Sequence, residues 1–295
     1  MVTLKELKNS LKKHRLRPSK KLGQNFLIDK TSIRKIIAAA DLQPGDVVLE
    51  IGPGLGSLTQ ELAKRVTKVI AVEKDKNMVA ILKEQLECLN VRNVQVVLGD
   101  ILKIEPRSFA KSRGEIENSF KIVGNLPFYL TAPVIRKFLE SENPPKEMIL
   151  VVQKEVAQRI CAKPPDMNLL AVAVQFYASP SQISSKFARA RPKIISYISR
   201  RSFWPSPKVD SAIIKIVPHN GTRTVLVPLF FKIVRAGFSQ PRKQLANNFS
   251  KMLKLDKETV KSWLWKNHIK PEQRAETLSL EDWKNLTKSA SGTDV

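Results

Sequence analysis

The sequence predicts an α/β fold in which helices cover both faces of a parallel sheet. Apolar, β-branched runs typical of buried strands recur at residues 47–51, 69–72, 94–98, 121–123 and 148–152. Stretches with helical periodicity separate them at residues 58–65, 77–89 and 132–139. Strands that are apolar throughout and alternate with helices indicate parallel pairing with both faces buried.

A further helix is predicted before the first strand, over residues 29–40. Asp29 is a good N-cap residue, and Ile33 and Ile36 lie at helical spacing behind it. The preceding residues 1–21 are basic, and we expect them to form an extension of the main domain.

In the second half of the chain, the sequence predicts irregular structure followed by one more strand. Residues 179–185 and 205–207 are rich in Pro and Ser, so we expect irregular chain between them and a last strand at residues 211–217. Asn220-Gly221 predicts a turn. We therefore place a domain boundary after this strand.

Two folded domains follow from this boundary. Residues 22–218 form the predicted α/β domain, and residues 219–295 a small helical domain. Trp263, Trp265 and Trp283 are the predicted core residues of the helical domain, because tryptophan buries a large apolar area.

The charge of the chain points to a polyanionic partner. Lys+Arg 51 against Asp+Glu 27 gives a net charge of +24. The excess is concentrated in residues 1–21, with eight basic residues and one acid, and in residues 167–255, with fifteen basic residues and one acid. Such clusters favour phosphate-backbone binding. A generally basic proteome remains an alternative, and a membrane surface lacks an amphipathic anchor.

Several functional classes are disfavoured by composition. Two cysteines, Cys88 and Cys161, and three scattered histidines fit no disulfide scaffold, metal site or thiol or histidine catalytic centre. No apolar run approaches the roughly 20 residues of a membrane span, and the N-terminus has no signal-peptide pattern. We expect a cytoplasmic monomer without a metal.

A glycine-rich turn after the first strand predicts a cofactor loop. It reads Gly52-Pro53-Gly54-Leu55-Gly56 and opens a helix, whose N-terminus offers unpaired N–H groups. The G-x-G-x-G register differs from the G-x-G-x-x-G dinucleotide fingerprint, and no phosphate-loop motif is present. A tight structural turn is the alternative.

Two acids at the next strand ends extend this site. Glu73 follows the second strand and is suited to ribose hydroxyls, and Asp100 follows the third and is suited to an adenine amine. Together with the glycine loop they predict a nucleoside site of the S-adenosylmethionine type. Each acid alone is equally typical of a helix N-cap or a solvated carboxylate.

The fourth strand ends in a motif suited to amine methylation. In Gly124-Asn125-Leu126-Pro127-Phe128, the Asn125 side-chain oxygen and the Leu126 carbonyl are expected to accept hydrogen bonds from an adenine amine. Phe128 is expected to stack on the base. Catalysis would rest on positioning and electrostatics, without a covalent intermediate. A strand-ending turn with core aromatic residues is the alternative.

These motifs resemble those of the ribosomal RNA adenine N6,N6-dimethyltransferase family. The resemblance rests on five segments in order, at residues 22–27, 50–56, 125–128, 153–156 and 203–212, the last reading Phe-Trp-Pro-Ser-Pro-Lys-Val-Asp-Ser-Ala. It implies a Rossmann-like class I methyltransferase fold with a small helical C-terminal domain. It also implies dimethylation of two adjacent adenosines near the 3′ end of small-subunit rRNA, late in subunit assembly.

The resemblance also implies the roles of individual residues. The expected S-adenosylmethionine ligands are Asn25, Leu27, Gly52, Gly54, Glu73, Asp100 and Asn125. Asn125, Leu126 and Phe128 are expected to hold the target base. The RNA contacts are predicted from the clustered basic residues and not from the resemblance, and they are Arg189, Arg191, Lys193, Arg200, Arg201, Arg242 and Lys243.

The chain departs from the family pattern in places. Phe128 stands where Tyr is usual, and Pro241 replaces the first basic residue of a Gln-Arg-Arg-Lys pattern. Residues 182–201 are longer and more basic than usual. Three alternatives stay open: a macrolide-resistance methyltransferase acting on the large subunit, a non-catalytic assembly or transcription-factor relative, and a eukaryotic-type dimethyltransferase.

Overall fold

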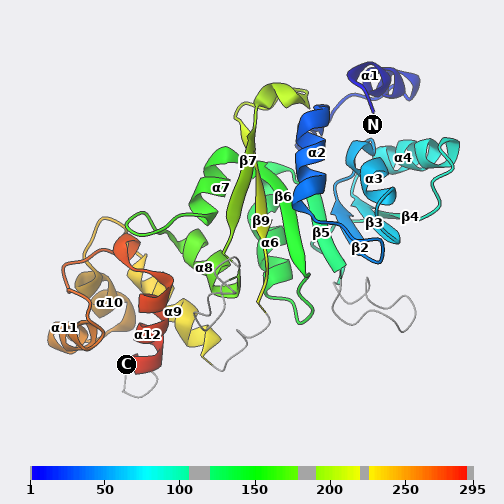
Figure 1. Cartoon of the computed structure of the whole chain (residues 1–295). Helices are drawn as coiled ribbons and strands as arrows, with labels where there is room; N and C mark the ends of the chain where they lie inside the picture. Colours follow the sequence, from blue (N-terminus) through cyan, green and yellow to red (C-terminus); the bar gives the residue numbers. More distant parts are fainter. Residues whose placement is uncertain (1, 106–119, 179–190, 220–225, 291–295) are drawn as a thin grey trace. The chain divides into compact units, whose positions relative to one another are not determined.

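The computed structural model describes residues 2–105, 120–178, 191–219 and 226–290 (Figure 1). The chain forms two compact units. Unit one comprises Met1–Ala157 and Pro192–Pro218, and unit two comprises Gln158–Arg191 and His219–Val295.

Unit one is built on a seven-stranded sheet in the order β4-β3-β2-β5-β6-β9-β7. The strands are β2 (Val47–Ile51), β3 (Lys68–Glu73), β4 (Val94–Leu98), β5 (Phe120–Asn125), β6 (Glu147–Gln153), β7 (Lys193–Ile198) and β9 (Ser211–Ile216). The five strands from β4 to β6 pair in parallel, as the sequence predicts. β9 is antiparallel to both of its neighbours, β6 and β7.

The strand β7 lies in the segment for which the sequence predicts irregular chain, and that prediction is wrong. β7 lies at one edge of the sheet, and Lys193, Ile195 and Tyr197 along it are exposed. Its exposed residues include the apolar Ile195 and its covered residues include the polar Ser196, so β7 has neither a continuous apolar run nor a clean polar and apolar alternation.

Helices bury both faces of the parallel strands. On one face, α2 (Lys30–Ala39), α3 (Ser57–Ala63) and α4 (Lys76–Cys88) share a core cluster with strand residues such as Val48, Val123 and Ile149. On the other face, Phe138 of α6 (Thr131–Leu139) packs edge-on against Phe120, with ring centroids 6.3 Å apart. The predicted N-cap Asp29 accepts hydrogen bonds from the N–H groups of Thr31 and Ser32.

The N-terminal segment is folded as part of unit one and is not a separate extension. Helix α1 (Leu4–Lys13) begins with a capping box between Thr3 and Glu6. Its residues Leu7 and Leu11 are buried in a separate hydrophobic cluster, which also contains Phe26, Leu55 and Met78. The sequence prediction overlooked this pair, because two leucines four residues apart are a weak signal within a Lys-rich segment.

A short ribbon lies beside this cluster. β1 (Phe26–Leu27) pairs antiparallel with β8 (Phe203–Trp204), and the 3₁₀ turn η3 (Arg200–Ser202) leads into β8. The ribbon therefore joins the N-terminal segment to the chain between β7 and β9.

Unit two is helical. It contains α8 (Leu169–Ala178), α9 (Val227–Gly237), α10 (Leu245–Leu253), α11 (Lys257–Lys266), η4 (Ala275–Thr277) and α12 (Leu280–Ala290), while α7 (Lys154–Ile160) crosses the boundary between the units. Phe176 of α8 stacks on Phe230 of α9, with ring centroids 4.0 Å apart. This packing explains why residues 158–178 belong to unit two, although the sequence placed them within the 22–218 domain.

Two of the three predicted tryptophan anchors are in the core of unit two. Trp283 is fully buried and Trp263 nearly so, but Trp265 is 55% exposed. Trp263 and Trp265 are two residues apart on α11, and side chains at that spacing point to different sides of a helix. The prediction for Trp265 was therefore wrong. The predicted Asn220-Gly221 turn lies outside the described residues.

No helix in the described ranges is long and apolar enough to cross a membrane.

Candidate functional site

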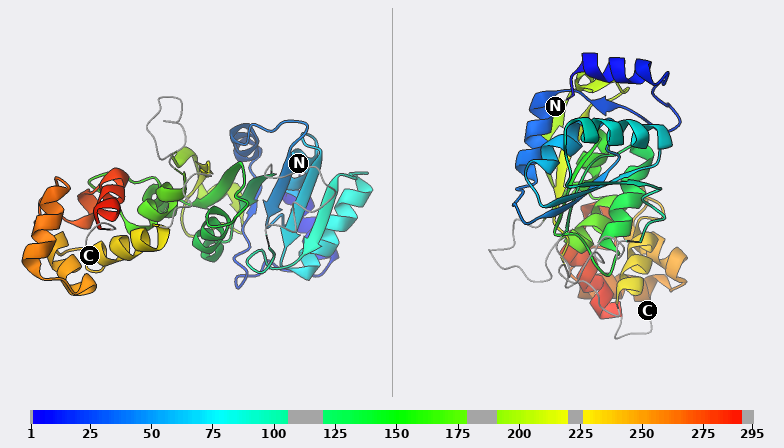
Figure 2. Two further views of the ribbon diagram at one scale, coloured as in Figure 1. Left: turned by 90° about the horizontal axis from the view of Figure 1, so that it is seen from below. Right: turned by 90° about the vertical axis from the view of Figure 1, so that its right-hand side faces the viewer.

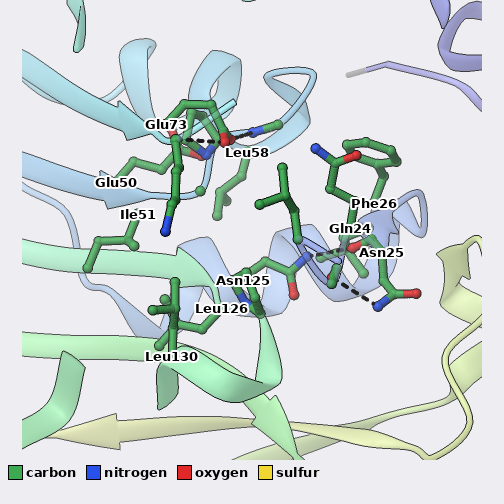
Figure 3. Close-up of a pocket in the computed structure, with 18 of the residues that line it drawn as sticks. Gln24, Asn25, Phe26, Glu50, Ile51, Leu58, Glu73, Asn125, Leu126 and Leu130 are labelled. Carbon is green, nitrogen blue, oxygen red and sulfur yellow. Dashed lines mark hydrogen bonds between the residues drawn. The ribbon is translucent and has the colours of Figure 1, made fainter. Parts of the chain in front are cut away.

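The pocket lies at the carboxyl ends of four adjacent strands (Figure 3). The order β4-β3-β2-β5 places Asp100, Glu73, Gly52 and Asn125 side by side, because parallel strands end at the same edge of a sheet. All predicted cofactor and base residues line this one pocket, namely Asn25, Leu27, Gly52, Gly54, Glu73, Asp100, Asn125, Leu126 and Phe128.

The glycine loop between β2 and α3 requires glycine for its shape. Gly52 and Gly54 have φ values of +70° and +55°, a region that other residues rarely adopt. A Cβ atom on Gly54 would lie 3.0 Å from the ring of Phe26. The loop backbone thus turns tightly beneath Phe26 at the pocket wall.

Glu73 is fixed by backbone N–H groups. Its Oε2 accepts a hydrogen bond from Gly54 N at 3.2 Å, and its Oε1 accepts from Lys74 N and Asp75 N at 2.8 and 2.9 Å. Burial raises the pKa of the Glu73 carboxyl, and these hydrogen bonds act in the opposite direction. The carboxylate is therefore oriented beside the glycine loop before any ligand arrives.

Asp100 already has partners in the protein. Lys74 Nζ donates to its Oδ2 at 2.8 Å, and Leu102 N donates to its Oδ1 at 3.0 Å. The hydrogen bond from Lys74 holds the pKa of Asp100 below its usual value. Asp100 is thus ionised, and its contact with Leu102 N caps a turn and not a helix.

Asn125 is oriented by the N-terminal segment. Its Nδ2 donates to the backbone carbonyl of Asn25 at 2.9 Å, while Asn25 Nδ2 donates to the carbonyl of Gly23 at 3.1 Å (Figure 3). With the nitrogen engaged in this way, Asn125 Oδ1 is the acceptor at the end of β5. Phe128 follows three residues later in the 3₁₀ turn η1 (Phe128–Leu130).

Two further pocket residues were given no role in the sequence prediction. Glu50 of β2 is buried, its Oε2 has no hydrogen-bond partner among the described residues, and burial raises the pKa of its carboxyl to about 8. Phe203 of β8 lines the same pocket. Both residues belong to segments that carry the family resemblance. The sequence therefore marked these segments as important, but it gave neither residue a role.

The predicted RNA contacts are divided between the two units. Lys193, Arg200 and Arg201 are exposed in unit one, the two arginines on η3 just before Phe203. Arg191, Arg242 and Lys243 are exposed in unit two. Arg189 lies outside the described residues. Within the described ranges, no group of His, Cys, Asp and Glu side chains is arranged to hold a metal ion.

Comparison with known proteins identifies the family. The family model for ribosomal RNA adenine dimethylase matches residues 15–291, nearly the whole chain. The chain belongs to the ribosomal RNA adenine dimethylase family. Its membership confirms the Rossmann-like methyltransferase fold, the enzyme class and the S-adenosylmethionine cofactor predicted from the sequence.

Individual relatives agree with this assignment. The ribosomal RNA small subunit methyltransferase A of Dehalococcoides mccartyi strain CBDB1 is 41% identical over 97% of this chain and 93% of its own length. A dimethyladenosine transferase structure from Plasmodium falciparum has a TM-score of 0.73 at 25% identity, covering 92% of this chain and 98% of that one. The 23S rRNA methyltransferase ErmE has a TM-score of 0.70 at 25% identity, covering 90% and 100%.

Proposed function

We propose that this enzyme dimethylates the N6 amines of two adjacent adenosines near the 3′ end of small-subunit rRNA. We further propose that it acts as a cytoplasmic monomer on the ribosomal subunit late in assembly. Within the dimethylase family, the small-subunit target is favoured by relatives such as the one from D. mccartyi, which is named for that subunit. The observation that carries the chemical proposal is the orientation of Asn125 at the end of β5.

The pocket fits S-adenosylmethionine, which supplies an electrophilic methyl group on a sulfonium sulfur when it is bound. The positive φ of Gly52 and Gly54 favours glycine there, so the loop that would face the cofactor carries no Cβ atom at these two positions. Glu73 offers carboxylate oxygens for ribose hydroxyls, and Asp100 offers an acceptor for the adenine amine. Glu50 Oε2, which has no hydrogen-bond partner in the described part of the chain, provides a buried acceptor for a cationic part of the cofactor.

The base is held by groups on β5 and the chain after it. Asn125 Oδ1 and the Leu126 carbonyl accept hydrogen bonds from the target amine, whose lone pair is otherwise delocalised into the adenine ring. These two acceptors favour a pyramidal nitrogen, so its lone pair becomes available for attack. Phe128 and Phe203 both line the pocket and offer aromatic faces for a flipped base.

Primer extension on both rRNAs tests the proposal. Purified protein and S-adenosylmethionine are incubated separately with small and large subunits that lack the modification, and reverse transcription then maps the blocked adenosines. We expect two adjacent stops near the 3′ end of small-subunit rRNA and none in large-subunit rRNA. A single stop in large-subunit rRNA would instead support the macrolide-resistance activity. No stop in either rRNA would contradict both activities.

A further inference from the structure

Helix α1 has one apolar and one cationic face. Leu7 and Leu11 are buried in the cluster that contains Phe26 and Leu55, two residues that line the pocket. The eight basic residues of the N-terminal segment are all exposed, and they are Lys5, Lys8, Lys12, Lys13, Arg15, Arg17, Lys20 and Lys21. Burial of the two leucines therefore fixes which side of α1 faces the solvent.

The helix is anchored to the wall of the pocket. Phe26, which packs with α1, closely approaches the glycine loop at Gly54. Phe26 is also paired in register with Trp204, and Lys8 Nζ lies 5.6 Å from the centre of the Trp204 ring. Figures 1 and 2 show α1 at the periphery of unit one, with its outer side away from the sheet.

Few acids neutralise this face. Glu6 is used in the capping box with Thr3, and Glu84 of α4 pairs with Lys13 and His14 at the end of the helix. In the described ranges, no carboxylate forms an ion pair with Lys5 or Lys12. Lys5 and Lys12 are seven residues apart, two helical turns, so they lie on the same stripe of α1.

We propose that this stripe of α1 binds phosphates of the substrate RNA and holds the strand beside the pocket. The proposal rests on the proposed function, because it names a contact surface for that RNA. The chain passes from α1 through Lys20 and Lys21 directly into residues 22–27, all of which line the pocket. Cations placed there contact the RNA backbone next to the flipped adenosine. They position the strand but do not contribute to sequence specificity, because they contact phosphates and not bases.

A double charge reversal, Lys5→Glu with Lys12→Glu, tests the surface. Binding of small-subunit rRNA is measured over a range of salt concentrations, together with kcat and KM for methylation. We expect the slope of log affinity against log salt to flatten by about 1.4 to 1.8, which corresponds to two lost phosphate contacts. We also expect KM for RNA to rise while kcat and the affinity for S-adenosylmethionine stay the same.

A matched control carries the same charge change at the opposite end of the sheet. Arg92 and Lys146 are exposed and lie within two residues of the starts of β4 and β6, so Arg92→Glu with Lys146→Glu changes the net charge equally, away from the pocket. The variant Lys5→Gln with Lys12→Gln preserves helical propensity, and thermal unfolding checks that α1 stays folded.

The outcomes separate the two proposals. A salt slope in the α1 variants equal to that of the control variant, or of the unmodified chain, would overturn the phosphate-binding role. Failure of the unmodified chain to methylate any small-subunit rRNA would instead overturn the proposed function.

Discussion

The side-chain amide of Asn125 donates to the backbone carbonyl of Asn25 at 2.9 Å, across 100 residues of sequence. The contact turns the amide oxygen of Asn125 away from the N-terminal segment and makes it the acceptor at the end of β5. It also explains why two distant motifs form one site. The segment before β1 sets the orientation of the side chain that β5 carries into the pocket.

Replacing Glu73 is expected to weaken cofactor binding. Glu73→Ala removes a carboxylate that three backbone N–H groups orient beside the glycine loop. We expect the binding free energy of S-adenosylmethionine in calorimetry to fall by about 1.5 to 3 kcal/mol, the scale of charge-assisted hydrogen bonds. Glu87→Ala, at an exposed position of α4, is the control. An unchanged affinity in Glu73→Ala would remove Glu73 from the site.

Phe128 is expected to act through its ring. Phe128→Tyr restores the residue usual in the family and keeps an aromatic face, so methylation in single-turnover assays should be retained. Phe128→Ala removes the stacking surface, which contributes about 1 to 3 kcal/mol per base in single-stranded nucleic-acid complexes, and should slow methylation. Equal rates for the Ala and Tyr variants would exclude stacking at this position.

Glu50 is expected to make the stability of the cofactor-free protein depend on pH. Burial raises the pKa of its carboxyl from 4.5 to about 8, so the folded protein retains a proton that the unfolded chain releases. Stability should therefore fall as pH rises between these two values, and Glu50→Gln should lose much of this dependence. Chemical denaturation at pH 5.5 and pH 8 measures it. If the unmodified chain and Glu50→Gln differ in unfolding free energy by the same amount at both pH values, the raised pKa of Glu50 is contradicted.

Exposed basic residues of unit one are expected to contact RNA phosphates. Arg200 and Arg201 lie on η3 immediately before Phe203, which lines the pocket, and Lys193 begins the edge strand β7 toward the opposite end of the sheet. Reversal of all three to Glu should weaken subunit binding and flatten its salt dependence by about 0.7 to 0.9 per lost contact. Cofactor affinity should not change. If the salt dependence is also unchanged, these residues are only a solvated surface.

The strand ends of the site were predictable because β3, β4 and β5 are mostly apolar runs that end at, or within two residues of, a polar residue. Glu73, Asp100 and Asn125 could be placed in this way, since parallel strands end together at one edge. The contact between Asn125 and Asn25 could not be predicted, because no periodic pattern in the sequence links the two segments that it joins. Leu7 and Leu11 of α1, and the half-exposed strand β7, were also missed because their burial depends on tertiary packing and not on a local pattern.

The most direct test combines Asn125→Ala with mass spectrometry of nuclease fragments of small-subunit rRNA. The unmodified chain should form N6,N6-dimethyladenosine at two adjacent positions. In single-turnover assays the variant should be slower by roughly ten-fold or more, the scale for loss of a positioned hydrogen bond. Its affinity for RNA serves as the control and should barely change, and the assays use saturating cofactor because Asn125 is also an expected S-adenosylmethionine ligand. A variant that dimethylates both adenosines at the normal rate would show that Asn125 does not orient the amine and would contradict the proposed mechanism.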